Sequence, residues 1–301
     1  MPVTLFCESH REGVLAIKDA TFASMNLGQF VWQPCQQIES LDQPSSRYVF
    51  EDGTVKGYGA AYQLDETHYR LNLIVHPDHL RKGIGLQLLN IVEQDVTRAN
   101  GKYLQARVFE DMPASVSFAL ASGFTRIHVM RGMTLRAADF CFDKWKDVGQ
   151  QLSDRFVVTT LKKELESGAD PVDKLARLYK LAREGWPSPD PTWRLDDTTE
   201  TLRAPFTNVK DPEHFSIMKD GDEYIGFTSA RNVGTGTAVH PNYRNLGIAT
   251  FVKAFDIDRC INDGDEHFES ATANTAMQRV NEKLGYRFKG LAEVRFVKEL
   301  S

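Results

Sequence analysis

Residues 73–85 read Leu73-Ile74-Val75-His76-Pro77-Asp78-His79-Leu80-Arg81-Lys82-Gly83-Ile84-Gly85, and this stretch, which occurs twice, decides the fold. Its second copy reads Thr237-Ala238-Val239-His240-Pro241-Asn242-Tyr243-Arg244-Asn245-Leu246-Gly247-Ile248-Ala249. Val, His, Pro, Gly and Ile recur with one constant offset, since Val75 and Val239 are 164 residues apart, as are Gly83 and Gly247. Agreement of residue type and spacing over this length indicates that the chain is a duplication.

The elements around the repeated stretch also recur. An amphipathic helix follows each copy, with apolar stripes of Ile84, Leu88, Ile91, Val92 and Val96 and of Ile248, Phe251, Val252 and Phe255. Further on, Gly123 and Gly285 close a second helix and are 162 residues apart. Upstream, Asp52-Gly53 and Asp220-Gly221 indicate hairpin turns between strand-like runs. Strands and helices in this order predict an α/β domain with a mixed sheet in each copy.

The repeat divides the chain into two domains and a short connection. We expect the first domain at residues 1–138, the connection at 139–152 and the second domain at 153–301, because about 150 residues suffice for a compact domain. The connection holds two Phe and one Trp but no Pro, whereas flexible linkers are poor in aromatic side chains. We therefore expect it to pack against one or both domains. The alternative is a helix or strand that only completes the first domain.

Composition and charge exclude several classes of protein. The formal net charge is −5, and no basic stripe of the kind that binds nucleic acid is visible. No segment approaches the roughly 18–20 apolar residues that cross a bilayer, and we expect no signal peptide. The four cysteines lie far apart without a CxxC pair. We therefore expect no disulfide, no metal site and a cytoplasmic location.

The repeated stretch places glycines where a strand passes into a helix. Amide groups in the first turn of a helix lack partners within it and lie at the positive end of the helix dipole, so they bind phosphate well. Gly83 with Gly85, or Gly247 with Ala249, leaves room for a pyrophosphate beside the backbone. Positive charge is added by Arg81, Lys82 and Arg244. A single Gly-x-Gly is more often an ordinary turn, but two equivalent copies favour a phosphate-binding loop.

The second copy resembles the GNAT acetyltransferase superfamily. That family's phosphate loop follows the pattern Gln/Arg-x-x-Gly-x-Gly/Ala after a strand that ends in Val-x-Pro, and Arg244, Gly247 and Ala249 match it. Asn274, together with the stretch Asn281-Glu282-Lys283-Leu284-Gly285-Tyr286, is similar to the family's later Asn…Asn-Glu-Lys-Leu-Gly-Phe motif.

The first copy departs from the family pattern at two places. Leu80 stands where the family has Gln or Arg, although Arg81 is adjacent, and Met112 stands where the family has the Asn. The resemblance covers roughly residues 3–136 and 155–298. It implies two tandem GNAT folds of the α/β (α+β) class, each a mixed, mostly antiparallel sheet flanked by helices.

The resemblance implies that acetyl-CoA lies in a V-shaped gap between two strands, 71–75 and 103–109 in the first copy and 235–239 and 266–272 in the second. The backbone N–H of Val239 would face the thioester carbonyl and stabilise the oxyanion as an amine attacks. The implied cofactor-binding residues are Val239, Arg244, Asn245, Leu246, Gly247, Ile248, Ala249, Thr250 and Asn274 in the second copy, and Ile74, Val75, Arg81, Lys82, Gly83, Ile84 and Gly85 in the first.

The general acid and base are not identified by the sequence. Many members of the family use a Tyr as general acid four residues before the Gly of the final turn, where this chain has Ala119 and Asn281. Asn281, in the better-matching copy, and Val239 are the candidate catalytic residues. We interpret His76 and His240 as turn residues rather than as catalytic groups. Three carboxylates near the gap are interpreted as solvated or structural: Glu110, Asp111 and Glu269.

The expected function is acetyl-CoA-dependent transfer of an acetyl group to an amine, of a small molecule, with the second copy catalytic and the first a degenerate or weaker site. No metal, nucleic acid or membrane takes part. Two alternatives stay open: a non-catalytic CoA-binding or regulatory protein, favoured by the missing Tyr, and a protein N-acetyltransferase. The sequence determines neither the acceptor amine nor the oligomeric state.

Overall fold

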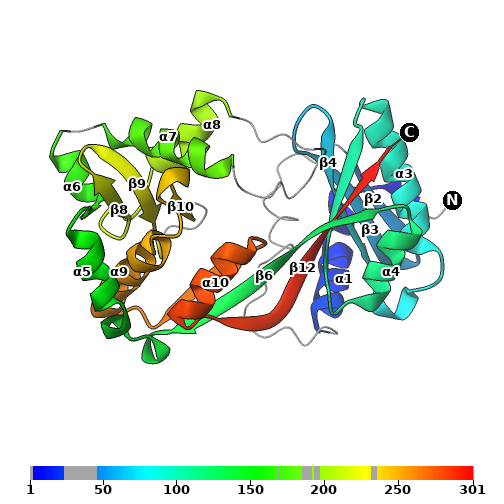
Figure 1. The fold of residues 1–301 in the computed structure, drawn as a ribbon. Coiled ribbons are helices and arrows are strands. Elements are labelled where there is room, and N and C mark those ends of the chain that lie inside the picture. Colours follow the sequence, from blue (N-terminus) through cyan, green and yellow to red (C-terminus); the bar gives the residue numbers. More distant parts are fainter. Residues whose placement is uncertain are drawn as a thin grey trace. The chain divides into compact units, whose positions relative to one another are not determined.

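The chain forms two compact units (Figure 1). The structure is a computed structural model that describes residues 3–23, 46–168, 170–184, 192, 197–231 and 236–300. Unit 1 consists of Met1–Val129, Asp190–Trp193 and Ala292–Ser301, and unit 2 of Met130–Pro189 and Arg194–Leu291.

Unit 1 is built on a seven-stranded part of the larger sheet, in the order β1-β2-β3-β4-β5-β12-β6. Its elements are β1 (Val3–Leu5), η1 (Glu8–His10), α1 (Arg11–Ala23), β2 (Ser46–Asp52), β3 (Thr54–Gln63), β4 (His68–Val75), η2 (Pro77–His79), α3 (Ile84–Arg98), β5 (Tyr103–Phe109), α4 (Pro113–Ala121), the start of β6 (Thr125–Arg136) and the end of β12 (Arg287–Glu299). The pairs from β1 to β4 and the pair β5–β12 are antiparallel, and β4 and β5 are parallel.

Helices α1 and α3 cover opposite faces of the unit 1 sheet. Successive side chains of a strand point to opposite faces, and β3 shows this directly. Ala61 packs in the core around α3, while its neighbour Ala60 packs with Val14 of α1. The apolar stripe expected on α3 is confirmed, since Leu88 and Val92 are fully buried.

Unit 2 repeats this arrangement with a shorter sheet. Its elements are the end of β6, η3 (Ala137–Asp139), η4 (Phe142–Trp145), α5 (Lys146–Ser153), β7 (Val157–Thr160), α6 (Leu161–Glu166), α7 (Pro171–Arg183), α8 (Thr199–Thr207), β8 (Ser216–Asp220), β9 (Glu223–Thr228), β10 (Thr237–Val239), η5 (Pro241–Tyr243), α9 (Ile248–Asn262), β11 (His267–Thr272), α10 (Thr275–Leu284) and the start of β12. Strands β10-β9-β8-β7 form one antiparallel sheet, and β11 pairs with β6.

Both expected hairpins are present. Asp52 pairs with Thr54 across the turn between β2 and β3, and Asp220 pairs with Glu223 across the turn between β8 and β9. The mixed α/β fold predicted for each copy is confirmed.

The two compact units do not coincide with the two copies of the sequence repeat. The last strand of the second copy contributes Phe296, fully buried, to the core of unit 1, and the last strand of the first copy contributes Leu135, 1% exposed, to unit 2. Each unit therefore completes its core with a strand from the other copy. The two compact units meet within β6 and β12. The domain boundaries expected at residues 139–152 concern the sequence repeat, and they stay a prediction.

The connecting segment packs on unit 2. Phe142 and Trp145 are partly buried against its two cores around α9. Gly149 of α5 lies so close to Phe251 that a Cβ at this glycine would stand 2.4 Å from the ring. The segment is therefore part of unit 2 and not a free tether. In the described part of the chain, no helix is long and apolar enough to cross a membrane.

Candidate acetyl-CoA site

The two histidines of the repeated stretch stabilise identical turns. His76 and His240 both have φ −54° and ψ 135° and begin a short 3-10 turn. The Nδ1 atom of His76 accepts a hydrogen bond from the N–H of Asp78, and Nδ1 of His240 accepts one from Asn242, each at 3.2 Å. This contact supports the interpretation of both histidines as turn residues, because the ring nitrogen is used by the backbone.

In both copies, the same two positions of the loop before the helix have a left-handed backbone conformation. Arg81 and Asn245 have φ of 63° and 65°, and Gly83 and Gly247 have φ of 79° and 83°. A side chain at the glycine positions would be strained, because the left-handed region favours glycine. Loops of this kind turn successive backbone N–H groups toward one point and form concave anion sites.

The helices after these loops begin without a side-chain cap. Gly83 and Gly247 occupy the N-cap positions, and the first helix-type bonds are donated by Gln87 to Gly83 O (3.1 Å) and by Phe251 to Gly247 O (3.0 Å). The amides that precede Gln87 and Phe251 in the first turn have no partner within the helix. They lie at the positive end of the helix dipole, where a phosphate group binds favourably.

Some side chains of the repeated stretch are buried in the core and anchor the loop, and others are exposed at its edge. Ile84 and Ile248 are 3% and 1% exposed and fix the helix start in the core, so only their amides can meet a phosphate. Thr250 is also buried, 7% exposed, which leaves little of its side chain for a ligand. Leu246 is 46% exposed at the loop tip. The exposed side chain of Arg244 donates from Nη2 to the carbonyl oxygen of Ala182 at 3.1 Å, which ties the loop to the end of α7.

The central strands of unit 1 separate into a V. Strands β4 and β5 pair only from His68 to Arg70, and beyond this point β4 pairs with β3 alone while β5 continues along β12. In unit 2 the corresponding strands belong to different sheets: β10 pairs with β9, and β11 pairs with β6. The separation of the two strands that the resemblance implied is therefore present in unit 1, and in unit 2 the described residues of β10 and β11 pair with other strands.

One backbone amide in each unit faces this gap. The N–H of His76 donates to Lys56 O at 2.9 Å, and successive N–H groups of a strand point to opposite edges. The N–H of Val75 therefore points away from β3, toward the splayed side. The same holds for Val239, since the N–H of His240 donates to Ile225 O at 2.9 Å. An N–H with this direction is available as an oxyanion-stabilising donor, and this role of Val239 stays a prediction.

Asn274 serves as the cap of α10. Its Oδ1 accepts hydrogen bonds from the amides of Ala276 (2.9 Å) and Met277 (3.4 Å). Met112, at the equivalent place in unit 1, makes no side-chain cap bond to α4. The capping bonds leave only the amide nitrogen of Asn274 for a ligand. Its part in cofactor binding stays a prediction.

Asn281 has a structural role that differs from the expected catalytic one. It is fully buried. The Nζ atom of Lys253 donates to its Oδ1 at 2.6 Å, and its Nδ2 donates to the Oγ of Ser270 at 3.0 Å. An amide that is enclosed and hydrogen-bonded at both ends is not available to a substrate. These contacts support a structural role for Asn281, and its expected part in catalysis stays a prediction.

Two ionisable groups of α9 lie inside unit 2, and neither was predicted from the sequence. Burial lowers the pKa of Lys253, 7% exposed, to about 8, and the nearby charge of Asp256 opposes this shift. Burial raises the pKa of Asp256, fully enclosed, to about 6. Its carboxylate accepts hydrogen bonds from Ser216 Oγ and from the N–H of Ala230, both at 2.7 Å. A comparison of the copies would have found them, because α3 is apolar at both equivalent positions.

Two of the carboxylates near the gap form ion pairs. Glu110 forms an ion pair with Arg126 at 2.7 Å, and Glu269 pairs with Lys289; both carboxylates are about half exposed. These contacts support the solvated interpretation. Among the described residues, no group of His, Cys, Asp or Glu side chains is arranged to hold a metal ion.

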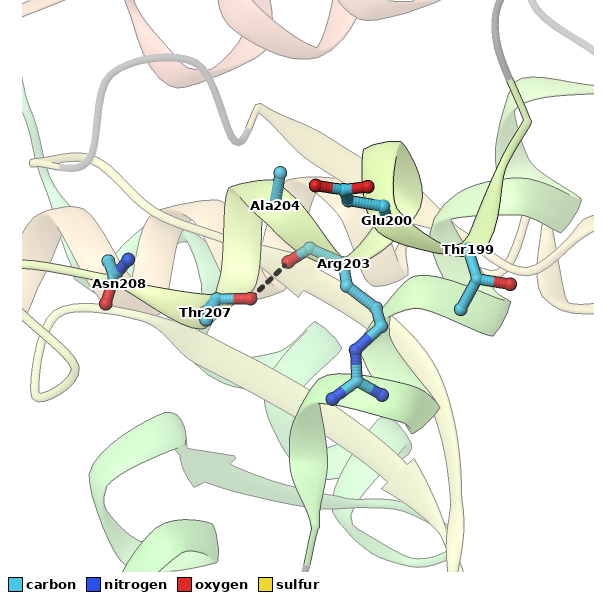
Figure 2. Close-up of a pocket in the computed structure, with 6 residues that line it drawn as sticks. All are labelled: Thr199, Glu200, Arg203, Ala204, Thr207 and Asn208. Atoms are coloured by element: carbon cyan, nitrogen blue, oxygen red, sulfur yellow. Dashed lines mark hydrogen bonds between the residues drawn. The ribbon is translucent and has the colours of Figure 1, made fainter.

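A surface hollow along α8 is separate from the loops. Figure 2 shows that it is lined by residues of one helix and the residue after it, with Thr207 Oγ1 donating to Arg203 O at 3.0 Å. No residue of the repeated stretch lines it, and its side chains form no cluster of converging polar groups. We assign it no role.

A family model matches the chain twice, and each match includes one of the two loops. The acetyltransferase (GNAT) family model matches residues 15–124 and again residues 175–286. A search of curated protein sequences found no significant match.

Solved structures with the same fold span the whole chain. A GCN5-related N-acetyltransferase from Sphaerobacter thermophilus is similar over 99% of this chain and 95% of its own, with 15% identity and a TM-score of 0.69. A tandem GNAT protein from the clavulanic acid biosynthesis pathway is similar over 99% and 98%, with 18% identity and a TM-score of 0.65. At these identities the likeness concerns the fold. Together with the twofold family match, it shows that the chain belongs to the GNAT acetyltransferase family and carries two GNAT domains in one polypeptide.

Proposed function

We propose that the protein is an acetyl-CoA-dependent N-acetyltransferase that acetylates an amine of a small molecule, with the second copy as the catalytic one. The observation that carries this proposal is the loop geometry of Gly247 and the uncapped helix start behind it. A pyrophosphate is the group that such a cradle fits, since the first amides of the helix lie together at the positive end of its dipole.

Cofactor binding and acetyl transfer depend on different residues of the second copy. The amides of Asn245 to Thr250 bind the pyrophosphate, with Arg244 at the edge of the loop. The N–H of Val239 donates to the thioester carbonyl oxygen as it becomes an oxyanion, an interaction worth roughly 3–4 kcal/mol in comparable sites. The amine nitrogen attacks the carbonyl carbon, the carbon–sulfur bond breaks, and CoA leaves as a thiolate that takes up a proton. The attacking nitrogen loses a proton to solvent or to a basic group of the substrate.

The second copy is preferred for two reasons. Arg244 and Asn274 match the family pattern, whereas Leu80 and Met112 replace these residues in the first copy. Residues Ile74, Val75 and 81–85 of the first copy retain the backbone geometry of a cofactor loop, so we expect there a second, weaker acetyl-CoA site or none.

Calorimetric titration with acetyl-CoA tests this assignment. Gly247→Val places a branched side chain at a left-handed position, 3.3 Å from Val148 at its Cβ alone, and Gly83→Val is the matched change in the first copy. We expect one tight site in the natural protein, lost in Gly247→Val and kept in Gly83→Val. The proposal fails if Gly247→Val keeps binding and turnover while Gly83→Val loses both. Two equal sites in the natural protein would contradict the assignment to one copy.

A non-catalytic CoA-binding or regulatory role is the second candidate. It is favoured by Ala119 and the enclosed Asn281, which leave the place of the family's Tyr without an acid in both copies. A screen of primary amines, with CoA thiol release followed by a disulfide reagent, separates the two. Turnover with any amine above the rate of Gly247→Val removes this candidate. A preference for peptides over free amines would instead favour a protein N-acetyltransferase.

A further inference from the structure

Three arginines and a glutamate share one face of the unit 1 sheet. Arg70 lies on β4, Arg107 on β5, and Glu293 and Arg295 on β12. The residues that alternate with them along these strands pack on the other face, in the core around α3: Tyr69, Leu71, Ala106, Val108, Val294 and Phe296. The four charged side chains therefore point to the face opposite α3. We call them the arginine cluster.

The register places the cluster where the V opens. Arg107 and Arg295 are directly opposite each other in the β5–β12 ladder. Arg70, opposite Gln105, is the last residue of β4 that pairs with β5. Opposed residues of a ladder have Cβ atoms about 5 Å apart, so two guanidinium groups start from adjacent positions. Like charges directly opposite each other are unfavourable unless an anion lies between them.

Positive charge exceeds negative charge in the arginine cluster. Arg295 Nε donates to Glu293 Oε1 at 2.9 Å, and Arg107 Nε lies 3.7 Å from the same oxygen. These three side chains are only 13–23% exposed. The buried Nε of Arg70 has no hydrogen-bond partner among the residues that the structure describes. A buried donor left without an acceptor costs free energy, so a ligand that accepts this bond is favoured.

The pKa values of the arginines reflect this crowding. Burial and, to a smaller extent, the charge of Arg70 lower the pKa of Arg107 to about 10, against the opposing effect of Glu293. The pKa of Arg70 is likewise lowered by burial and then by the charge of Arg295, against the opposing effect of Glu293. The arginines thus disfavour one another's charge, Glu293 opposes this effect, and an additional anion would oppose it further.

We propose that the arginine cluster binds the oxyanion group of a small molecule, a carboxylate or a phosphate, in unit 1. The planar guanidinium presents paired donors that match both groups, and charge-assisted bonds of this kind are the strong ones. The unused Nε of Arg70 supplies a donor, while Arg295 and Arg107 supply the compensating charge. This site is distinct from the backbone loop at Gly83, and it does not depend on the proposed function.

Thermal shift and calorimetric titration of the full chain test the site, with succinate and inorganic phosphate as separate probes. Arg70→Gln is the test variant, and Arg295→Gln provides a second one should the first fold poorly. Arg98→Gln is the matched control, because it removes the same charge from unit 1 at a side chain that is 70% exposed. Gly83→Val is included in the phosphate series, because the backbone loop at Gly83 is a candidate phosphate site of its own.

We expect saturable binding of at least one probe, weakened roughly 10-fold or more by Arg70→Gln and Arg295→Gln and retained in Arg98→Gln and Gly83→Val. Without a probe, Arg70→Gln should melt no lower than the natural protein, because it removes a crowded positive charge. Binding of succinate alone would identify the ligand as a carboxylate, and binding of phosphate alone as a phosphate. Absence of saturable binding, or equal affinities in Arg70→Gln and Arg98→Gln, would overturn the proposal.

Discussion

Lys253 donates a hydrogen bond of 2.6 Å to Asn281 inside unit 2, where the same fold in unit 1 has two apolar side chains. The equivalent residues are Leu89 and Ala119, which are 1% and 4% exposed. The apolar pair shows that the fold itself does not need a buried ammonium group at this place. The polar pair is therefore a property of the second copy, and its two members depend on each other.

A double-mutant cycle should reveal this dependence. Lys253→Leu leaves the buried carbonyl oxygen of Asn281 without a donor, a cost of about 1–3 kcal/mol. Asn281→Ala leaves a buried ammonium group without its acceptor, a cost of about 3–5 kcal/mol. We expect the double variant, which imitates Leu89 and Ala119, to cost at least about 1 kcal/mol less than the sum. Urea unfolding measures the free energies, and costs that add within about 0.5 kcal/mol would show that the residues act separately.

The stability of unit 2 should rise between pH 8 and 10 because of Lys253. Burial lowers the pKa of this lysine from 10.5 to about 8. The cost of enclosing its ammonium group is therefore fully present below pH 8 and disappears as the pH rises toward 10.5. Over that range the natural protein should gain up to about 3 kcal/mol relative to the double variant. Melting of both proteins at pH 7 and pH 10 checks this, and a constant difference in Tm would contradict it.

Gly149→Ala should destabilise unit 2. A Cβ at this position would stand 2.4 Å from Phe251, so α5 must move away from α9. Overpacking of this kind costs typically about 1–3 kcal/mol. Gln150→Ala, on the exposed side of α5, is the control and should melt like the natural protein. Equal melting of the two variants would show that the connecting segment is not packed as described.

Phe296→Ala should destabilise unit 1 although this residue belongs to the second copy. Its side chain is fully buried in the core around α3, and truncation of a buried Phe costs about 3–5 kcal/mol. Phe288→Ala, at the 46% exposed end of the same strand, is the comparison and should have little effect. Hydrogen exchange by mass spectrometry can follow α3, where faster exchange is expected for Phe296→Ala alone. Unchanged protection of α3 would refute the contribution of β12 to this core.

Residues 153–301 expressed alone should not behave as an independent domain. They lack Met133 and Leu135, which are 2% and 1% exposed in the core of unit 2, and they lack the α5 helix that covers Phe251. We expect low solubility or a markedly lower Tm than in the full chain. A fragment that stays soluble, melts like the full protein and keeps its acetyl-CoA affinity would show that the copies are independent.

The sequence was most informative where backbone conformation follows from local residue types. The loops at Gly83 and Gly247 could be predicted because a left-handed N-cap favours glycine and because the same spacing occurs twice. The turn role of His240 also follows from its position before a proline at the start of a 3-10 turn. The function of Asn281 could not be predicted in this way. Its environment depends on Lys253, 28 residues earlier, and on Ser270 of a neighbouring strand.

The sequence by itself determined the duplication, the hairpins, the amphipathic helices and the two glycine loops, because each depends on residues close together in the chain. Only the tertiary structure decided which sheet receives the strands that carry Leu135 and Phe296. An apolar strand satisfies its backbone hydrogen bonds at any free sheet edge, so its own sequence does not specify the partner. The arginine cluster follows from the same pairing. Arg295 meets Arg107, 188 residues earlier in the chain, because β12 runs beside β5.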